Sequence, residues 1–239
     1  MSILSFQEVS YAYDQENVLD NITFNIPEGK IIGLIGANGA GKSTLIKHIV
    51  RYLTPDKGMI KYMNKDIYEL ADNMFPISYI PDEPVVFDEL TVIEHLMFIS
   101  AVYGTNKDME KLIDRLELQD HLFKTPFALS KGTMQKLSIG CALLKPHKIL
   151  VADEPFTGLD PKQINNLKKI FVEEKEQGKT VLLSTHLLEV VENTCEYFIF
   201  IEKGRLKIRG SLEEIRGELS ATSLEEVYLL LENIDACRE

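Results

Sequence analysis

Cysteine, basic charge and long apolar runs are all scarce in this sequence of 239 residues. Its three cysteines, Cys141, Cys195 and Cys237, stand far apart along the chain. Their spacing fits neither a zinc site nor a paired disulfide framework. We therefore expect ordinary thiols in a reducing compartment.

Basic residues are outnumbered, because 26 lysines and arginines stand against 37 aspartates and glutamates. The formal net charge is −11 and the pI is near 5.0. This balance argues against the broad basic face that binding to nucleic acid usually requires. It indicates a solvated acidic surface, and we expect no nucleic-acid partner.

The most apolar long stretch, residues 85–103, is interrupted by Asp88, Glu89, Glu94 and His95. These side chains exclude a membrane-spanning helix in this stretch. Residues 1–9 alternate in the manner of a strand, without the basic start and apolar core of a secretory signal. We expect a cytosolic protein that would need a partner for any work at a membrane.

The order of strand and helix signals predicts an α/β fold. Alternating runs at residues 6–9 and 22–26 indicate an antiparallel β layer at the start of the chain. Further strands are predicted at residues 31–35, 59–63, 77–80, 149–152, 181–184, 197–201 and 206–208, the last two forming a hairpin. With 45% apolar residues, the chain can bury a full core in one large domain, with or without an inserted subdomain.

Helix starts are marked by residues that can satisfy the free N–H groups of a first turn. Thr91 with Glu94 forms a capping box at the start of residues 91–145, which are helical in character throughout. We predict an inserted helical subdomain at about residues 84–146. The other predicted helices run from Lys42 to about Leu53, from the cap Ser130 to Pro146, and from the cap Asp160 to Gly178, with two more in the tail after the boxes Ser211 with Glu214 and Ser223 with Glu226.

A glycine-rich loop, residues 36–44 with the sequence GANGAGKST, connects the strand at residues 31–35 to a helix. It matches the pattern G-x-x-x-x-G-K-[ST], which holds a nucleotide phosphate. Glycines let successive backbone N–H groups turn inward around the phosphate, in conformations that a Cβ would obstruct. Lys42 would then reach the outer phosphates, and the Ser43 hydroxyl would ligate Mg²⁺. A plain glycine turn is the alternative.

An acidic pair, Asp153 and Glu154, follows the buried strand at residues 149–152, at the end where open α/β sheets bind ligands. Asp153 can hold Mg²⁺, directly or through water. Glu154 is then placed to take a proton from a water that attacks the terminal phosphate, a role worth about 10²- to 10⁴-fold in rate. Taken alone, such a pair could equally cap the next helix, and the glycine loop is what favours the catalytic interpretation.

Two later segments carry a family resemblance, since residues 129–133 read LSKGT and residues 153–160 read DEPFTGLD. In this order and spacing after the glycine loop, they resemble motifs of the nucleotide-binding subunit of ATP-binding cassette (ABC) transporters, over about residues 3–210. The resemblance implies a P-loop NTPase core with a mixed sheet, an N-terminal antiparallel β subdomain and an inserted α-helical subdomain. It also implies ATP and Mg²⁺ as ligands.

The resemblance assigns further site residues. Tyr13 looks like the aromatic residue that stacks on adenine, and His186 like the switch histidine at the γ-phosphate, although such residues in isolation more often belong to a core or a surface. Glu154, His186 and Lys42 would be catalytic. The expected ATP-binding residues are Tyr13, Gly36, Asn38, Gly39, Ala40, Gly41, Lys42, Ser43 and Thr44, and the expected metal ligands are Ser43, Asp153 and Asp82.

A head-to-tail dimer is also implied by the resemblance. Ser130 and the N–H groups near Gly132, at a helix N-terminus that favours anions, would close over ATP held by the glycine loop of the other chain. Asp160 would cross the same interface. The partner would be a second copy of this chain or a homologous cassette.

Two residues depart from the family pattern. Asp82 stands where the family usually has a glutamine that contacts Mg²⁺ and faces the transmembrane partner, and its carboxylate could still bind the metal. Lys131 replaces a signature glycine. It would be either a cation near the phosphates or a solvated side chain, and we favour the second.

The tail, residues 211–239, is expected to be a short helical extension after an ATPase domain at residues 1–210. It looks like the tails of bacterial drug, bacteriocin and antibiotic-resistance ATPases that serve export permeases. The tail residues that could equally pack on the chain's own core are Leu224, Val227, Leu230 and Leu231.

We therefore expect an ATP-binding and ATP-hydrolysing subunit that drives a separate integral-membrane permease from the cytoplasmic face of the cell membrane, in export more than in import. One alternative is a soluble ATPase of the same fold that acts on ribosomes or DNA. A single cassette and the lack of sustained heptads argue against it. A P-loop kinase is the other alternative, and it would need no LSKGT segment.

Overall fold

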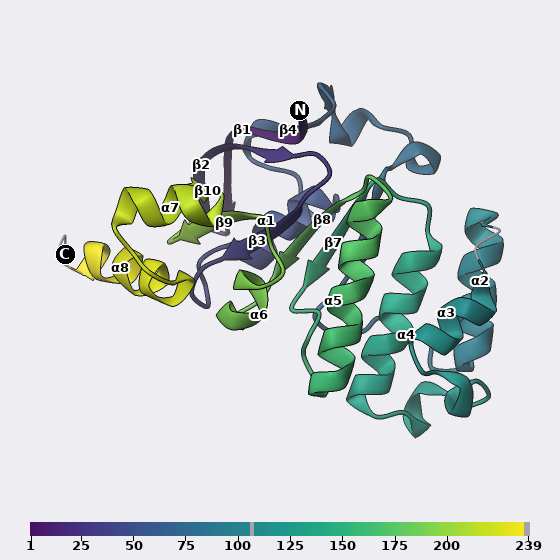
Figure 1. Cartoon of the computed structure of the whole chain (residues 1–239). Helices are drawn as coiled ribbons and strands as arrows, with labels where there is room; N and C mark the ends of the chain where they lie inside the picture. Colours follow the sequence, from purple (N-terminus) through teal and green to yellow (C-terminus); the bar gives the residue numbers. More distant parts are fainter. Residues whose placement is uncertain (106–107, 237–239) are drawn as a thin grey trace.

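The structure is a computed structural model that describes residues 1–105 and 108–236, and Figure 1 shows its two β-sheets and the helices around them. Within these residues the larger sheet has the strand order β10-β9-β3-β8-β7-β6. Its strands are β3 (Ile31–Ile35), β6 (Ile77–Ile80), β7 (Ile149–Asp153), β8 (Thr180–Ser184), β9 (Tyr197–Glu202) and β10 (Arg205–Gly210). All neighbours pair in parallel except β9 and β10, so the predicted mixed sheet and final hairpin are confirmed.

The central strands are buried along their whole length and mostly apolar, because both faces of the sheet are covered. Every residue of β3, β7 and β8 is buried. Alternate side chains enter two different cores, since Ile32 and Leu34 pack with the N-terminal sheet whereas Ile31 and Ile35 pack with the helices. The larger sheet is therefore the middle layer of the molecule.

The N-terminal sheet is antiparallel throughout, as the alternating runs predicted. Its strands are β1 (Ser2–Tyr13), β2 (Glu16–Pro27), β4 (Lys57–Tyr62) and β5 (Lys65–Asp66), in the order β2-β1-β4-β5. β1 and β2 are longer than the sequence pattern indicated, because their pairing continues from Ser2 opposite Pro27 to Tyr13 opposite Glu16. Irregular register along this pairing interrupts the alternation by which a strand is recognised.

Helix α1 (Lys42–Ile49) packs in the core that the two sheets share, where it buries Leu45, Ile46 and Ile49. The predicted end near Leu53 is wrong, because the helix stops at Ile49. Arg51 adopts a left-handed conformation with a φ of 64°, which a right-handed helix cannot continue through.

The helices α2 (Val92–Tyr103), α3 (Met109–Arg115) and α4 (Lys131–Leu144) lie between β6 and β7 in the chain, as predicted, and Figure 1 shows them at one end of the molecule. The capping box forms, with Thr91 N–H donating to Glu94 Oε2 at 2.8 Å. The region is not helical throughout, since short 3₁₀ turns at Gln119–His121 and Pro126–Ala128 and several loops interrupt it. Together with α5 (Pro161–Glu176), these helices form the core on the face of the larger sheet that carries Ile31 and Ile35.

The tail helices α7 (Leu212–Leu219) and α8 (Leu224–Ala236) follow β10 and lie at the other end of the molecule from α2 (Figure 1). Leu224 and Val227 are fully buried in the helix-covered core, so these tail residues pack on the chain itself. The capping box of α7 forms as predicted. The box predicted for α8 is wrong in one of its two bonds: Ser223 accepts from Glu226 N–H at 3.1 Å, but the Glu226 carboxylate accepts from the preceding Thr222 N–H at 2.7 Å.

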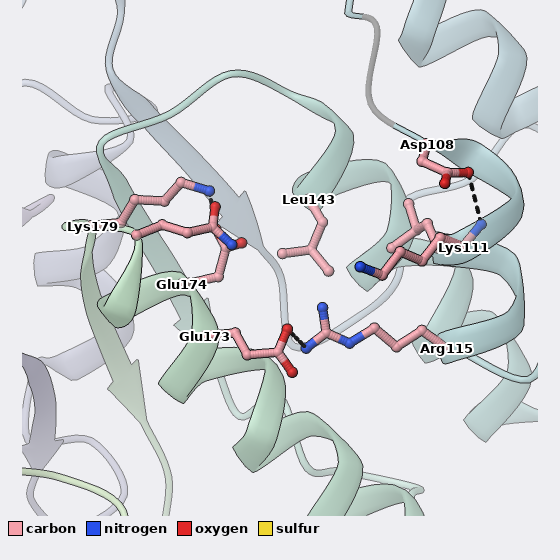
Figure 2. Close-up of a pocket in the computed structure, with 9 residues that line it drawn as sticks. Asp108, Lys111, Arg115, Leu143, Glu173, Glu174 and Lys179 are labelled. Atoms are coloured by element: carbon pink, nitrogen blue, oxygen red, sulfur yellow. Dashed lines mark hydrogen bonds and ion pairs between the residues drawn. The ribbon is translucent and has the colours of Figure 1, made fainter.

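A charged cleft of about 240 Å³ separates α3 from the carboxyl end of α5, and Figure 2 shows its lining. Arg115 of α3 pairs with Glu173 of α5 at 2.7 Å across it. Glu174 turns the other way and accepts from both Lys179 and His147 at 2.6 Å. Burial alone would raise the pKa of Glu174, but the bonds from His147 and Lys179 outweigh it and lower this pKa to about 2.

Among the cysteines, Cys141 and Cys195 are free thiols, and burial raises the pKa of Cys141 to about 12. Cys237 lies outside the described residues. Within the described ranges, no helix has both the length and the apolar character needed to cross a membrane.

Candidate nucleotide site

The glycine loop connects β3 to α1 in a space that admits little besides glycine. A Cβ on Gly36 would lie 2.2 Å from the carbonyl oxygen of Ile201, and one on Gly41 would lie 3.0 Å from that of Val18. Gly39 and Gly41 also have φ angles of 80° and 102°, which residues with a Cβ rarely adopt. The glycines are therefore required both for the backbone path and for its packing between β2 and β9.

A cleft of about 440 Å³ opens beside this loop. Four segments line it: the β1–β2 hairpin, the glycine loop with the start of α1, the segment after β6 and the end of β7. The lining residues are Tyr13, Glu16, Val18, Asn38, Gly39, Gly41, Lys42, Ser43, Thr44, Asp82, Asp153 and Glu154. All except Glu16 and Val18 were proposed as site residues from the sequence, so the fold brings together residues from distant parts of the chain.

The β1–β2 hairpin forms one edge of the cleft. Tyr13 is 41% exposed and packs edge-on against Tyr11, with ring centroids 5.0 Å apart. Glu16 and Val18 were not among the residues predicted from the sequence. Their only sequence signal is the hairpin itself, because Glu16 pairs directly with Tyr13 and Val18 follows on the same strand.

Lys42 begins α1, and its side chain folds back over the glycine loop. Its Nζ donates to the carbonyl oxygens of Gly36 at 2.7 Å and Ala37 at 3.1 Å. Burial lowers the pKa of Lys42, and the negative charges of Glu154 and Asp153 oppose part of that shift. The ammonium thus lies between the loop and the two carboxylates, where it can meet a phosphate.

Asp153 and Glu154 are held by the neighbouring strand β8. The Ser184 hydroxyl donates to Asp153, and the Glu154 N–H donates to the carbonyl oxygen of Ser184 at 3.0 Å. Glu154 has a φ of 44°, and such a conformation costs a residue other than glycine on the order of 1–3 kcal/mol. Strain of this kind is typical of functional sites, where the surrounding structure enforces it.

His186 follows β8 and contacts Glu154, although it does not line the cleft itself. Its Nδ1 lies 3.0 Å from Oε2 of Glu154, and the His186 side chain is 67% exposed. The fold thus places the predicted histidine against the predicted base. An exposed ring in this position can still contact a ligand.

Asp82 enters the cleft from the segment after β6. Burial raises its pKa, the negative charges of Asp153 and Glu154 raise it further, and Lys131 offsets part of the rise. Within the described residues, no three acidic, histidine or cysteine side chains converge as a metal site. The carboxylates and the Ser43 hydroxyl nevertheless fit Mg²⁺, which takes oxygen ligands and is usually held by one or two carboxylates together with substrate phosphates.

Two predicted residues of the glycine loop, Gly36 and Ala40, lie behind the cleft and not on its wall. Gly36 packs against Ile201, and the carbonyl oxygen of Ala40 accepts from Gly204 N–H at 3.0 Å. They hold the loop against the β9–β10 hairpin and do not face the ligand space.

Ser130, Gly132 and Asp160 do not line the cleft of their own chain. Ser130 caps α4, and Asp160 caps α5 in a capping box, so both predicted caps form. Gly132 packs so closely on Gly158 that a Cβ would lie 2.6 Å from the Gly158 carbonyl oxygen. This contact joins the starts of α4 and α5 side by side.

A parallel sheet that carries a glycine loop and lysine at one strand end, and an acidic pair at the end of the next strand but one, defines a nucleotide-binding protein of the P-loop class. Comparison with known proteins is more specific. The family described as ABC transporter matches residues 19–157. The chain belongs to this family, as an ATP-binding subunit of the kind that hydrolyses ATP.

Individual relatives agree with this assignment over nearly the whole chain. The sequence is 39% identical over 247 residues to the ABC-type transporter ATP-binding protein EcsA of Bacillus subtilis (strain 168), with 100% of each chain covered. It is 31% identical over 228 residues to the lantibiotic transport ATP-binding protein SrtF of Streptococcus pyogenes, covering 95% of this chain and 96% of that one. A solved structure described as the ATP binding subunit of an ABC transporter aligns with a TM-score of 0.90 and 36% identity, over 97% of this chain and 100% of that chain.

Proposed function

We propose that this chain powers a separate membrane permease, by binding and hydrolysing ATP at a site shared between two cassettes. The observation that carries the proposal is the meeting of Lys42 and the glycine loop with Asp153 and Glu154 in one cleft. A phosphate-binding loop, a pair of carboxylates and room for a nucleotide are what hydrolysis of a terminal phosphate requires.

In this proposal the chain's own residues divide the chemistry. The N–H groups of the glycine loop and the Lys42 ammonium hold the phosphates, and Tyr13 stacks on adenine at the edge of the cleft. Ser43 and Asp153, with Asp82 beside them, hold Mg²⁺, which when bound neutralises charge on the phosphates. Glu154 takes a proton from the attacking water. His186 orients the Glu154 carboxylate and contacts the γ-phosphate.

Two substitutions test these roles separately. Glu154→Gln keeps the shape of the side chain but removes the base, so we expect hydrolysis to fall by about 10²- to 10⁴-fold while ATP binding persists. Lys42→Ala removes the cation from the loop, so both binding and hydrolysis should be lost. If the Lys42→Ala variant hydrolyses ATP as fast as the wild-type chain, the proposed site is overturned.

The proposal places Ser130, Gly132 and Asp160 in the site of a second cassette, either another copy or a homologue. Support comes from their position, because all three lie at helix starts outside the cleft of their own chain. Helix N-termini favour phosphate. Size exclusion of the Glu154→Gln variant should show an ATP-Mg²⁺-dependent dimer, and an unchanged monomer peak would contradict the shared site.

A permease partner is supported by exposed apolar side chains on α2 and on the segment that precedes it. Val85 and Phe87, shortly after Asp82, are 81% and 53% exposed, and Met97 and Phe98 of α2 are 57% and 45% exposed. Phe87 and Phe98 lie edge to face with centroids 5.6 Å apart, so the segment and the helix form one surface. Contiguous exposed apolar side chains of this kind mark interaction sites.

The same proposal sets the location and organisation of the protein. The chain would lie on the cytoplasmic face of the cell membrane through its permease, with export favoured by its similarity to a lantibiotic transport protein. Residues 1–210 would form the ATPase domain, with a helical subdomain at about residues 84–146, and residues 211–239 would form its extension.

Recovery of tagged chain from detergent-solubilised native membranes tests the partner. We expect an integral-membrane protein to be recovered with wild-type chain and with Leu229→Ala, which removes an exposed side chain from α8. Recovery should fall with Phe87→Ser and Phe98→Ser, which leave the cleft intact. If the membrane fraction holds no chain, or if all variants recover the same amount, the permease proposal fails.

A further inference from the structure

Helix α8 reaches the back of the glycine loop. A cavity of only about 20 Å³ is bounded by Gly36 and Ala37 of the loop, by strands β9 and β10, and by Tyr228 and Leu231 of α8. A space of this size holds a single water at most. The tail and the start of the glycine loop therefore bound the same small cavity.

The position of α8 is determined by its buried first turns. Leu224 and Val227 are fully buried in the main core. Tyr228 and Leu231 follow them at a spacing of four residues, so each lies on the same face of the helix as its buried predecessor. Both are partly buried and pack against the same core. The face that anchors α8 thus also presents these two side chains to the glycine loop.

The part of the loop that shares this cavity with α8 is also the part that holds the Lys42 ammonium. Nζ of Lys42 donates to the carbonyl oxygens of Gly36 at 2.7 Å and Ala37 at 3.1 Å. Gly36 also packs closely on the backbone of Ile201, which bounds the same cavity. A shift of these two peptides toward the cavity would therefore move Lys42 relative to the phosphates.

We propose that Tyr228 and Leu231 are positioning residues that hold Gly36 and Ala37, and through them Lys42, in the conformation that binds ATP. This inference rests on the proposed role of the glycine loop. The tail lies outside residues 19–157, the part of the chain that the family model matches. ATP affinity is thus set in part by a segment that is not itself in the nucleotide cleft.

The test measures ATP affinity and turnover for substitutions along α8. Leu231→Ala and Tyr228→Ala each remove packing behind the loop, so the Kd and KM for ATP should rise about fivefold. The kcat at saturating ATP should stay within about twofold of wild type, because no group in contact with the reacting atoms is lost. Tyr228→Phe and Leu231→Met, which refill the space, should restore wild-type affinity.

Leu229→Ala is the matched control, because Leu229 lies on the same helix and is 50% exposed. Its Kd for ATP should equal that of wild type. Thermal unfolding without nucleotide identifies any variant that fails to fold, and Leu231→Val then replaces Leu231→Ala, with an expected rise in Kd of about twofold.

Failure of the positioning role and failure of the nucleotide site give different results. If Leu231→Ala and Tyr228→Ala are folded and bind ATP as tightly as Leu229→Ala, the positioning role is overturned while the nucleotide site stands. If kcat falls and Kd is unchanged, the positioning role is equally overturned. If wild-type chain itself does not bind ATP, the proposed site fails first.

Discussion

The glycine loop and the segment at residues 129–133 are both starts of helices, yet they are arranged very differently. The loop at the start of α1 meets carboxylates from β7 and the segment after β6 in one cleft of its own chain. Ser130 and Gly132, at the start of α4, do not line that cleft. Ser130 caps its own helix, and Gly132 packs on Gly158.

The two helix starts therefore differ in which charged groups of the cleft lie beside them. Lys42 and the carboxylates of Asp153 and Glu154 already face one another. At the N-terminus of α4, Ser130 accepts from Thr133 N–H at 3.2 Å, and the charge of Lys131 acts on Asp82, but no residue of α4 is among those that line the cleft. The first region brings the glycine loop and the carboxylates together within one chain, whereas in the proposed function the second would meet a ligand held by another chain.

Mixing two inactive variants tests this comparison most strongly. Ser130→Asp preserves an N-cap but sets a negative charge against phosphate, so hydrolysis should fall at least about 10²-fold. Lys42→Ala should be equally inactive. A mixture of the two should recover about a quarter of the wild-type rate, because half of randomly paired dimers contain both chains and each has one intact site of two. Phosphate release at fixed total protein measures this.

The mixture has a clear control. Ser130→Asn also caps a helix but carries no charge, and it should retain most of the activity. An absence of recovery, with both variants folded, would mean that each site is completed within one chain and that the two regions are not halves of one site.

Glu174→Gln tests whether a change remote from both regions affects either of them. Folding should lose about 3 kcal/mol, because the pKa of Glu174 lies near 2 in the folded chain against an ordinary value of 4.5. Since the folded pKa is depressed, this stabilisation is present above about pH 4.5 and is lost as the pH falls toward 2. Denaturant unfolding at several pH values measures it.

The variant should therefore lack part of the acid-side decline in stability that wild-type chain shows. Glu117→Gln, which breaks an exposed pair with Lys162, is the control and should change stability much less. ATP affinity at pH 7 should be unchanged in both variants while they remain folded. A loss of affinity in folded Glu174→Gln would show that the cleft is less self-contained than the comparison implies.

The substitution Asp82→Gln tests whether the segment after β6 takes part in Mg²⁺ binding beside the glycine loop. Glutamine is the residue usual in the family at this position. The substitution also removes one negative charge near Asp153 and Glu154. We expect the Mg²⁺ concentration for half-maximal hydrolysis to rise about threefold, with ATP binding in the absence of metal unchanged or slightly improved. An unchanged Mg²⁺ requirement would remove Asp82 from the metal site.

Lys131→Ala should have the smallest effect. The side chain is exposed and its stem lies over Gly158, so we expect hydrolysis within about twofold of wild type. The apparent affinity for ATP, read from the ATP concentration at which half of the Glu154→Gln chains dimerise with and without Lys131→Ala, gives the sharper measurement. A tenfold loss of affinity there would mean that Lys131 contributes a cation to the second region.

The sequence predicted the parts of the site that depend on local chemistry. The glycine loop, the strand before Asp153 and the caps Thr91, Ser130, Asp160 and Ser211 are each recognised from a few neighbouring residues, and each forms as expected. The end of α1 was missed because it depends on the left-handed conformation of Arg51, which no residue type nearby requires.

Other features were missed because they depend on contacts between distant segments. Glu16 and Val18 line the cleft only because the β1–β2 hairpin folds over the glycine loop. The carboxylate of Glu226 accepts from Thr222 and not from Ser223, a choice between two adjacent N–H groups that sequence spacing does not resolve.

The sequence by itself determined that the chain holds a phosphate-binding loop, an acidic pair at a strand end and helices with well-capped starts, because glycine conformation, apolar runs and capping act over a few residues. Tertiary structure alone decided that β8 lies between β3 and β7, which sets Lys42 opposite Asp153 and Glu154, and that α8 packs behind Gly36 and Ala37. Strand order and helix docking follow from the burial of apolar faces that lie far apart in the chain, and no local pattern encodes which faces will meet.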